Sequence, residues 1–476
     1  MNKNNNSNGK FKVAKYSNII FIIIAFLILI FFYFIPTPDG LTHDGKVMIG
    51  ILLMAAILWI IEPIPLAVTG LLIMIIQPIM HVIPPNEVFA SFGSQAIFFL
   101  VGAFIIAGAI EKHGLHRRIA LRFLSHFEKT PRIFTFGIMS SCAFLSFAMP
   151  AHGVAALFLP IVVSILIAMK ITPRQSNFGK VSMLCVAYGC SIGSMGTLIG
   201  GARNPLTIGL LSDLTVPINV TFFDWMIYSM PVVFISLPLV WIILQFSFPI
   251  EINDISEAKK EIKNQVIKAG KMSKKETIVL TVLIITILLW IFFSSYTYFG
   301  LAVIAILGSI FLFITKTINW NDVEKRVPWG IILLYGGAIT LGIGIQKTGA
   351  GNWIVNALFH TVGINPYLVV IVIIILTVLL TNIMSNIGAV AILLPIGIAI
   401  SSEIPGISPL LAAMIIALSA GFAFMLVIAT PGNAITYSSG YFSTKDLFKA
   451  GSIANIACIL VIFAIAIVYW IGYLHI

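Results

Sequence analysis

A hydroxyl and a carboxamide stand side by side in a hydrophobic stretch of the second half of the chain. In TNIMSNIGAVAILLP, residues 381–395, they belong to Ser385 and Asn386. Together they can donate hydrogen bonds to a carboxylate and offer oxygen atoms to a small cation such as sodium. Ordinary hydrogen bonding between helices is the alternative, because small polar residues serve this purpose in membranes.

A related stretch in the first half has different chemistry. SFAMPAHGVAALFLP, residues 146–160, contains Pro150, His152 and Gly153. Proline and glycine interrupt helices, and a histidine in hydrocarbon needs a polar partner. His152 is therefore a candidate proton acceptor or substrate donor, and the alternative is a neutral imidazole satisfied by a nearby carbonyl.

Arg203 is the single charge that lies deep in an apolar segment. It belongs to SMGTLIGGARNPLT, residues 194–207, whose three glycines, with Gly193 just before them, permit an unwound backbone or close helix packing. A charge far from both ends of a membrane span is costly and is by default a functional hypothesis. The alternatives are that Arg203 extends to an interface or pairs with a carboxylate.

Composition shows what kind of chain positions these residues. Of its 476 residues, 59% are hydrophobic and only 9% are charged, and the mean hydropathy is +1.07. A soluble domain carries about 25% charged residues. The chain is therefore expected to be an integral membrane protein, with apolar runs that suit helices rather than barrel strands. Four cysteines without metal-ligand spacing are expected to be buried thiols (Cys142, Cys185, Cys190 and Cys458).

Three blocks recur in one order along the chain. GAFIIAGAIEKHG at 102–114 recurs as GAITLGIGIQKTG at 337–349. SFAMPAHGVAALFLP at 146–160 recurs at the same offset as TNIMSNIGAVAILLP at 381–395. SMGTLIGGARNPLT then pairs with FMLVIATPGNAIT, residues 424–436. The sequence thus predicts a duplicated unit behind one extra helix.

This duplication gives an explicit domain organisation. We predict a polar tail at 1–17, a first transmembrane helix at 18–35, repeat 1 at 46–248, a linker at 249–276 and repeat 2 at 277–476. Each repeat is expected to contain a re-entrant hairpin, at 133–169 and 366–400. An unwound span is expected after each hairpin, at 181–210 and 408–440.

Positive charge predicts the topology. With a cytoplasmic N-terminus and about 11 transmembrane helices, 25 of the 28 Lys and Arg residues fall on the cytoplasmic side, two (Lys46 and Lys347) outside, and Arg203 within the membrane. An odd number of spans per repeat inverts the second repeat, and the C-terminus is then outside the plasma membrane. The net charge of +11 is explained without nucleic acid.

Broken segments in hydrocarbon point to a class of function. Irregular backbone is tolerated there only where it lines protein or a wet cavity. Free helix N-termini suit an anion and freed carbonyls a small cation, which is the site architecture of secondary transporters. A channel is the alternative. A membrane enzyme is disfavoured, because no nucleophile–base pair, metal cluster or Walker loop is present, and no organic cofactor is expected.

With these motifs in hand, the chain resembles the divalent anion:sodium symporter family, transporters of dicarboxylates, citrate and sulfate. The resemblance rests on WIIEPIPLAVTGLL (59–72), FLVGAFIIAGAIEKHGLHRRIAL (99–121), MGTLIGGARN (195–204) and VIATPGNA (427–434). It implies a homodimer, a scaffold domain and a transport domain in each protomer, and elevator-like movement of the transport domain.

The resemblance also implies the site residues, with Na⁺ as the coupling ion. A second sodium site would comprise Thr381 and Asn386 with backbone at Met384 and Ala429, and a first would comprise Ser146, Ala151 and Gly196. The expected substrate-binding residues are Pro150, Ala151, His152, Arg203, Asn204, Ser385, Asn386, Ile387, Thr430 and Asn433.

The first half departs from the family pattern. Pro150-Ala151-His152 replaces Ser-Asn-Thr, and Arg203 stands where the family usually has proline. The second tip, Ser385-Asn386-Ile387, keeps two of the three positions. We therefore predict a sodium-coupled carrier of a small divalent anion, most plausibly a C4-dicarboxylate. Sodium-independent exchange and proton coupling through His152 are the alternatives.

Overall fold

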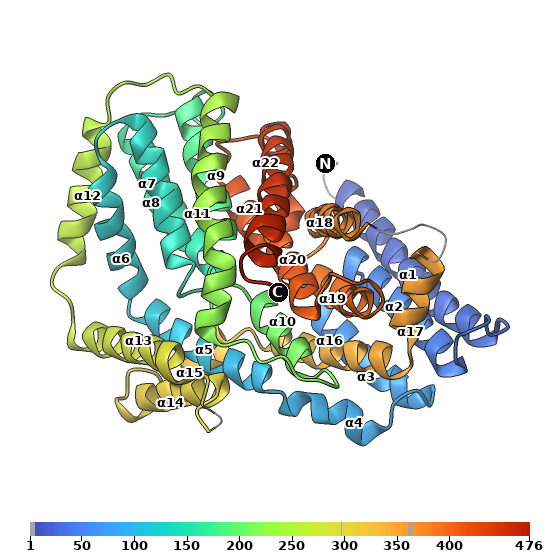
Figure 1. Ribbon diagram of the computed structural model, residues 1–476. Coiled ribbons are helices and arrows are strands. Elements are labelled where there is room, and N and C mark those ends of the chain that lie inside the picture. The colour runs from blue at the N-terminus through green and yellow to red at the C-terminus, as the bar shows by residue number, and fades with distance from the viewer. Residues whose placement is uncertain (1–4, 297, 360–364) are drawn as a thin grey trace.

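The computed structural model describes residues 5–296, 298–359 and 365–476, and the regular structure in these ranges is helical (Figure 1). The helices of the first half are α1 (Asn5–Phe34), α2 (His43–Ile61), α3 (Leu66–Ile79), α4 (Pro85–Ala90), α5 (Gln95–Lys112), α6 (Leu115–Leu124), α7 (Pro131–Leu145), α8 (Ala151–Ala168), α9 (Asn177–Gly193), α10 (Arg203–Ser212) and α11 (Phe222–Ser247). Those of the second half are α12 (Ser256–Ala269), α13 (Lys274–Phe293), α14 (Leu301–Ile314), α15 (Trp320–Arg326), α16 (Trp329–Lys347), α17 (Ala350–Phe359), α18 (Pro366–Ile383), α19 (Asn386–Glu403), α20 (Pro409–Ser419), α21 (Pro431–Tyr437) and α22 (Thr444–Ile465).

Short helical turns complete the fold. They are η1 (Ser91–Gly93), η2 (Ser125–Phe127), η3 (Val427–Ala429) and the π-helical end of the chain, η4 (Ala466–Ile471).

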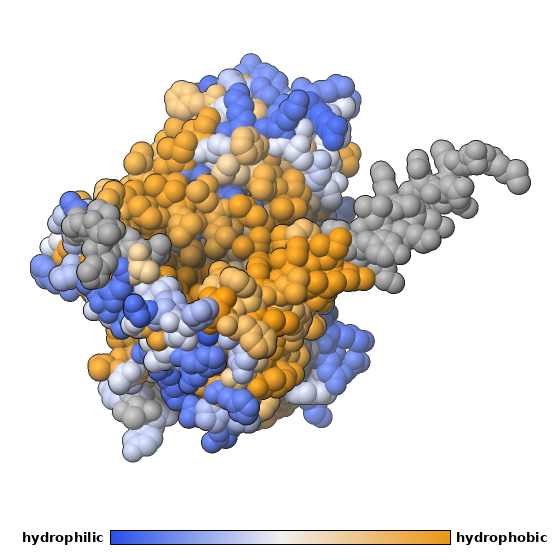
Figure 2. Space-filling view, turned by 90° about the vertical axis from the view of Figure 1, so that its right-hand side faces the viewer, coloured by the Kyte–Doolittle hydropathy of each residue, from blue (hydrophilic) through white to orange (hydrophobic). Residues whose placement is uncertain are grey.

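The chain is a multi-pass membrane protein. Within the described ranges, nine helices are long and apolar enough to cross a membrane, and shorter apolar helices accompany them. Large apolar side chains face outward, among them Phe34, Phe234 and Phe246. Figure 2 shows hydrophobic residues across the middle of one face, with hydrophilic residues above and below them. This distribution is what contact with lipid requires. The count of 11 spans remains a prediction.

Two helix pairs enclose the broken helices. In Figure 1, α7 and α8 lie on one side and α18 and α19 on the other, with α10, α20 and α21 between them. Helices α7 and α8 pack against α9, and α18 and α19 pack against α20. Each helix pair thus contacts the broken helix of its own half. A further group, in which α5 packs on α14 and α3 on α16, surrounds this centre.

Capping residues determine where the central helices begin. Pro366 follows Asn365, whose side chain accepts a hydrogen bond from the Tyr367 backbone N–H. Thr430 caps α21 in the same way, and Ser176 caps α9. Such caps satisfy backbone donors that have no partner within the helix, which matters most in hydrocarbon.

Lys46, which the charge distribution predicts on the outer side, is buried. It lies in the first turn of α2 with 3% of its surface exposed. Its Nζ donates to the carbonyls of Tyr33, at 3.0 Å, and Ile35, at 2.6 Å. These carbonyls end α1, and a lysine satisfies such groups well. The residue therefore joins the first helix to the repeat.

Arg118 links the two halves at the side predicted to be cytoplasmic. Its guanidinium donates to Gly270 O at 2.6 Å and Ala269 O at 2.8 Å, where α12 ends. It also pairs with Glu276, the capping-box residue of α13, at 3.0 Å. The backbone N–H of Ser273 also donates to Glu276 Oε2, at 2.6 Å.

We expect Arg118→Gln to lower the thermal unfolding midpoint. Charged hydrogen bonds contribute about 1.5–3 kcal/mol each. The measurement is thermal unfolding of the purified protein at neutral pH.

Lys260→Gln is the control for this measurement. Lys260 pairs with Glu257, but their side chains are 69% and 52% exposed. Exposed pairs contribute little to stability, because water and salt screen them. Equal midpoints for the two variants would contradict a stabilising role for Arg118.

Candidate functional site

The tip between α18 and α19 is a tight, polar turn. Helix α18 ends at Ile383 and α19 begins at Asn386, so Met384 and Ser385 form the break. Ser385 Oγ accepts a hydrogen bond from Gly388 N at 3.2 Å and caps α19. Ser385, Asn386 and Ile387 are half-buried. Their polar groups are thus held in place while staying within reach of a ligand.

Three oxygen atoms gather just inside this tip. Thr381 Oγ1 lies 2.9 Å from Asn386 Oδ1 and 2.9 Å from the carbonyl oxygen of Ala420, where α20 ends. A hydroxyl has one proton and can satisfy only one of these contacts. The remaining oxygen–oxygen contact is favourable if a cation lies beside it. Oxygen ligands are those that hard cations prefer.

Backbone carbonyls complete the second predicted sodium site. The carbonyls of Met384 and Ala429 accept no hydrogen bond from the residues that the structure describes. Ala429 is buried in η3, next to the start of α21. In the same part of the chain no group of three or more His, Cys, Asp or Glu side chains could hold a metal. A cation would therefore depend on hydroxyl, amide and carbonyl oxygens.

Asn382 joins this helix pair to the broken helix, a role absent from our sequence predictions. Its Nδ2 donates to Phe422 O at 3.2 Å, and its Oδ1 accepts from Met425 N at 2.8 Å. The side chain is 3% exposed. A carboxamide next to Thr381 in an apolar helix was the available signal, because a buried polar group requires partners.

Asn433 holds the unwound backbone of the second half in shape. Its Nδ2 donates to Ala423 O and Leu426 O, both at 2.9 Å, and the residue is fully buried. Its backbone N–H donates to Thr430 Oγ1 at 3.1 Å. The Nδ2 group of Asn433 is thus engaged with protein, its Oδ1 has no hydrogen-bond partner among the described residues, and Thr430 serves as a helix cap. Both residues support the site and its neighbouring helix start.

Asn204 does the same in the first half. Its Nδ2 donates to Ser194 O at 2.9 Å and to Thr197 O at 2.7 Å. The two contacts lie ten and seven residues before the asparagine, the same spacings as in the second half. This match aligns the two unwound spans residue by residue, with Asn204 opposite Asn433.

The tip of the first half lacks the matching polar groups. Pro150 precedes α8, which starts at Ala151 without a side-chain cap. His152 is exposed and makes no side-chain hydrogen bond to the described residues. Ser146 is buried, and its Oγ has no partner in the described part of the chain. The oxygen cluster of the second half therefore has no counterpart beyond Ser146.

The structure brings Gly200, rather than Gly196, against Ser146. The Gly196 carbonyl accepts a hydrogen bond from Ser229 on α11 at 3.1 Å. A side chain on Gly200 would instead collide with the carbonyl oxygen of Ser146. The spacing to Asn204 also places Gly200, not Gly196, opposite Ala429. The predicted first-site residue Gly196 therefore has its carbonyl engaged by Ser229, and Gly200 is the glycine in contact with Ser146.

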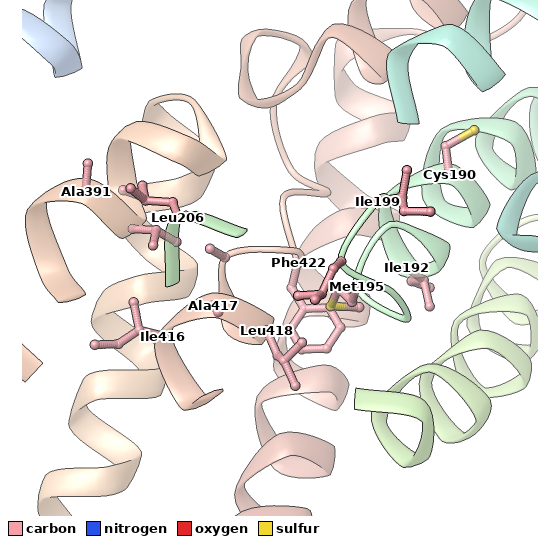
Figure 3. Packing of buried hydrophobic residues seen from close by; sticks show 14 of the residues in the cluster. Cys190, Ile192, Met195, Ile199, Leu206, Ala391, Ile416, Ala417, Leu418 and Phe422 are labelled. Atoms are coloured by element: carbon pink, nitrogen blue, oxygen red, sulfur yellow. The ribbon is translucent and has the colours of Figure 1, made fainter. Parts of the chain in front are cut away.

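Arg203 lies between the two broken helices. Its Nε donates to Ala417 O at 2.9 Å, near the end of α20, and its Nη2 to Ser194 Oγ at 3.1 Å, at the end of α9. Figure 3 shows the apolar packing here, with Met195 beside Phe422, and Ala417 between this pair and Leu206. With 3% of its surface exposed, Arg203 neither extends to an interface nor pairs with a carboxylate of the described residues.

Accessibility differs between the halves. Every residue from 191 to 201 is buried. In the second half, Ile428 is 73% exposed, and Pro431 and Ala434 are exposed beside it. Helix α21 packs against α8, so these residues adjoin the first helix pair. Only the second unwound span thus presents an open side.

Broken helices enclosed by two helix pairs in a multi-pass membrane protein define the class as a membrane transporter. The sequence model of the family described as "sodium:sulfate symporter transmembrane region" matches residues 15–475 of the chain. The chain therefore belongs to this family, which is also called the divalent anion:sodium symporters. It is accordingly a transporter and not an enzyme. The resemblance predicted from its motifs is confirmed.

Relatives with assigned names support the same family. The chain is 32% identical over 460 residues to the sodium-dependent dicarboxylate transporter SdcS of Staphylococcus saprophyticus, covering 91% of this chain and 87% of that one. It is 32% identical over 471 residues to SdcS of Staphylococcus aureus strain RF122, covering 94% and 88%.

Solved structures confirm the fold alone. MtrF of Neisseria gonorrhoeae, described as illuminating a class of antimetabolite efflux pumps, has a TM-score of 0.59 at 12% identity and covers 96% of this chain and 94% of its own. The YdaH transporter of Alcanivorax borkumensis has a TM-score of 0.53 at 13% identity, covering 81% and 88%.

Proposed function

We propose that the chain carries small dicarboxylates across the membrane together with sodium. The observation that supports this most directly is the oxygen cluster of Thr381, Asn386 and Ala420, whose close oxygen–oxygen contact a bound cation would make favourable. Two relatives that match nearly the whole chain are named sodium-dependent dicarboxylate transporters. Thr381 and Asn386, with the carbonyls of Met384 and Ala429, would hold the sodium ion.

The anion would bind on the open side of the second tip. Ser385, Asn386 and Ile387 are half-buried there, and α19 begins at Asn386 with its positive dipole end toward the break. Sodium beside the tip offsets one negative charge of a dicarboxylate, so each ligand raises the affinity for the other. Thr430 and Asn433 would position the neighbouring helix, and Pro150, Ala151, His152 and Asn204 would border the site from the first half.

Movement and orientation follow as parts of the proposal. The two helix pairs and the broken helices would move together as a transport domain, and the group around α5, α14, α3 and α16 would be the stationary scaffold. The cytoplasmic N-terminus, the outer C-terminus and the homodimer come from the charge distribution and the family resemblance. A reporter fused after Ile476 tests the orientation, since it should be active only outside the cytoplasm.

Ligand-dependent stability tests the proposed substrate class. A ligand that binds only the folded protein raises the thermal midpoint by mass action. We expect succinate to raise the midpoint in sodium chloride and to have a much smaller effect in potassium chloride of equal ionic strength. Sulfate and citrate in the same screen decide between the anion classes. No shift with any dicarboxylate in either salt would contradict the proposal.

Exchange without sodium is the second candidate. The first tip, with Pro150, Ala151 and His152 in place of polar groups, favours it. Stimulation of uptake by internal dicarboxylate in the absence of sodium would support exchange. A dependence on a proton gradient that His152→Ala abolishes would support proton coupling instead.

A further inference from the structure

Arg203 is a buried positive charge held by neutral groups. Its recorded hydrogen-bond acceptors are the Ala417 carbonyl and the Ser194 hydroxyl. No carboxylate of the described residues lies within 4.0 Å of it. An ion buried without a counter-ion is costly, and both acceptors lie at helix ends whose dipoles favour a cation. The site is thus built to keep a positive charge in place and leaves that charge without a protein counter-ion.

The internal repeat shows what stands at the matching positions of the second half. The Asn204–Asn433 match places Arg203 opposite Gly432, and the repeated tip places Ala151 opposite Asn386. One half therefore has a carboxamide and no fixed cation. At the same two positions the other half has a fixed cation, Arg203, and no carboxamide at its tip.

The guanidinium lies beside the backbone that would form the first sodium site. A side chain on Gly201 would meet Arg203 Nη1 at 2.9 Å and Ser194 O at 3.2 Å. The adjacent Gly200 lies against the carbonyls of Ser146 and Ser194. The guanidinium of Arg203 would repel a sodium ion placed there. The two positive charges would be separated by about one residue, and buried surroundings screen charges poorly.

The oxygen atoms that could coordinate sodium are also fewer in the first half. Ala151 contributes no side-chain oxygen, and the Gly196 carbonyl already accepts a hydrogen bond from Ser229. The unwound span is buried throughout residues 191–201, whereas the second-half span is open at Ile428. Among the predicted site residues of the first half, Ser146 Oγ and Asn204 Oδ1 are the buried side-chain oxygens without a hydrogen-bond partner in the described structure, and the tip itself adds none.

We propose that Arg203 takes the place of a sodium ion in the first half of the chain. Sodium then binds at the Thr381–Asn386 cluster alone. A divalent anion is balanced by one exchangeable cation and one cation that belongs to the protein. This inference rests on the proposed function, and it adds the number of sodium sites and the residue that replaces the missing one.

The test is a sodium titration of the thermal midpoint of the purified protein, without substrate and with total salt kept constant by potassium. Internal symmetry offers a matched pair of variants. Thr381→Val should raise the sodium concentration for half-maximal stabilisation at least about tenfold. Ser146→Ala, at the equivalent position, should change it less than about twofold. The unmodified protein should show a Hill slope near one, as expected for about one site.

Arg203 itself is tested by titrating succinate at saturating sodium. Arg203→Gln retains a donor for Ala417 O but removes the charge, and we expect at least about a tenfold loss of succinate affinity. Arg203→Lys keeps the charge and should stay within about threefold. If both variants lower the midpoint but leave succinate affinity unchanged, Arg203 is only a structural link and the inference is overturned.

A half-maximal sodium concentration that changes less than about twofold in Thr381→Val, or a loss in Ser146→Ala as large as that in Thr381→Val, would also overturn it. In either case sodium and succinate still bind the unmodified protein, so the proposed function stands. If succinate binds under no condition, the proposed function itself fails.

Discussion

Sodium-dependent uptake of a dicarboxylate is expected to fall at least about tenfold when Thr381 is replaced by valine. The substitution keeps the shape of the side chain and removes the hydroxyl that contacts Asn386 Oδ1 and Ala420 O, each at 2.9 Å. Uptake at saturating sodium should recover in part, because the carbonyls and Asn386 remain. Asn386→Ala should have a larger effect, since it also removes a predicted contact with the anion.

Thr377→Val is the control for this result. Thr377 lies one turn earlier on α18, is fully buried, and donates only to Ile373 O within its own helix, at 2.7 Å. Valine there should leave the sodium dependence within about twofold, because a back-bonded hydroxyl contributes little to a helix. If the two threonine variants behave alike, the cluster at Thr381 is not a sodium site.

Asn433→Leu is expected to cause the largest loss of folded protein. The carboxamide satisfies two buried carbonyls, those of Ala423 and Leu426. Leucine of similar size leaves both without a partner, at a cost of about 1–3 kcal/mol each. We expect a thermal midpoint lower by several degrees at least, since about 1 kcal/mol shifts it by a few degrees. The measurement is thermal unfolding in detergent.

Asn455→Leu separates this effect from burial alone. Asn455 lies on α22 with 3% of its surface exposed, yet neither polar atom of its side chain has a partner within the described residues. Replacing it with leucine should be neutral or stabilising, because a buried group without partners is costly. A midpoint as low in Asn455→Leu as in Asn433→Leu would show that the carbonyl contacts do not carry the effect.

Much of the fold is readable from apolar length and helix breakers. Pro366 begins α18, and the segment Met384–Ser385 interrupts the helix where the sequence places its polar pair. The confirmed family resemblance follows from motifs that surround these breaks. Such signals are local, because a proline, a glycine or a cap acts on its own few residues.

The contacts between segments are less visible in the sequence. Arg203 donates to the backbone carbonyl of Ala417. Every residue has such a carbonyl, so the residue type at position 417 does not indicate that it accepts this hydrogen bond. Asn382 engages Phe422 and Met425 for the same reason. Lys46, predicted only to lie on the outer side, is buried because its Nζ donates to the carbonyls that end α1. Tertiary geometry decides these partners.

Uptake of labelled succinate into proteoliposomes tests the central claim most directly. Vesicles containing the purified protein are diluted into sodium or potassium medium at equal ionic strength, with no dicarboxylate inside. We predict that succinate accumulates when an inward sodium gradient is present, that the potassium medium reduces uptake at least about tenfold, and that Thr381→Val removes the difference. Equal uptake in the two media, or uptake that requires internal dicarboxylate and ignores sodium, would contradict sodium coupling.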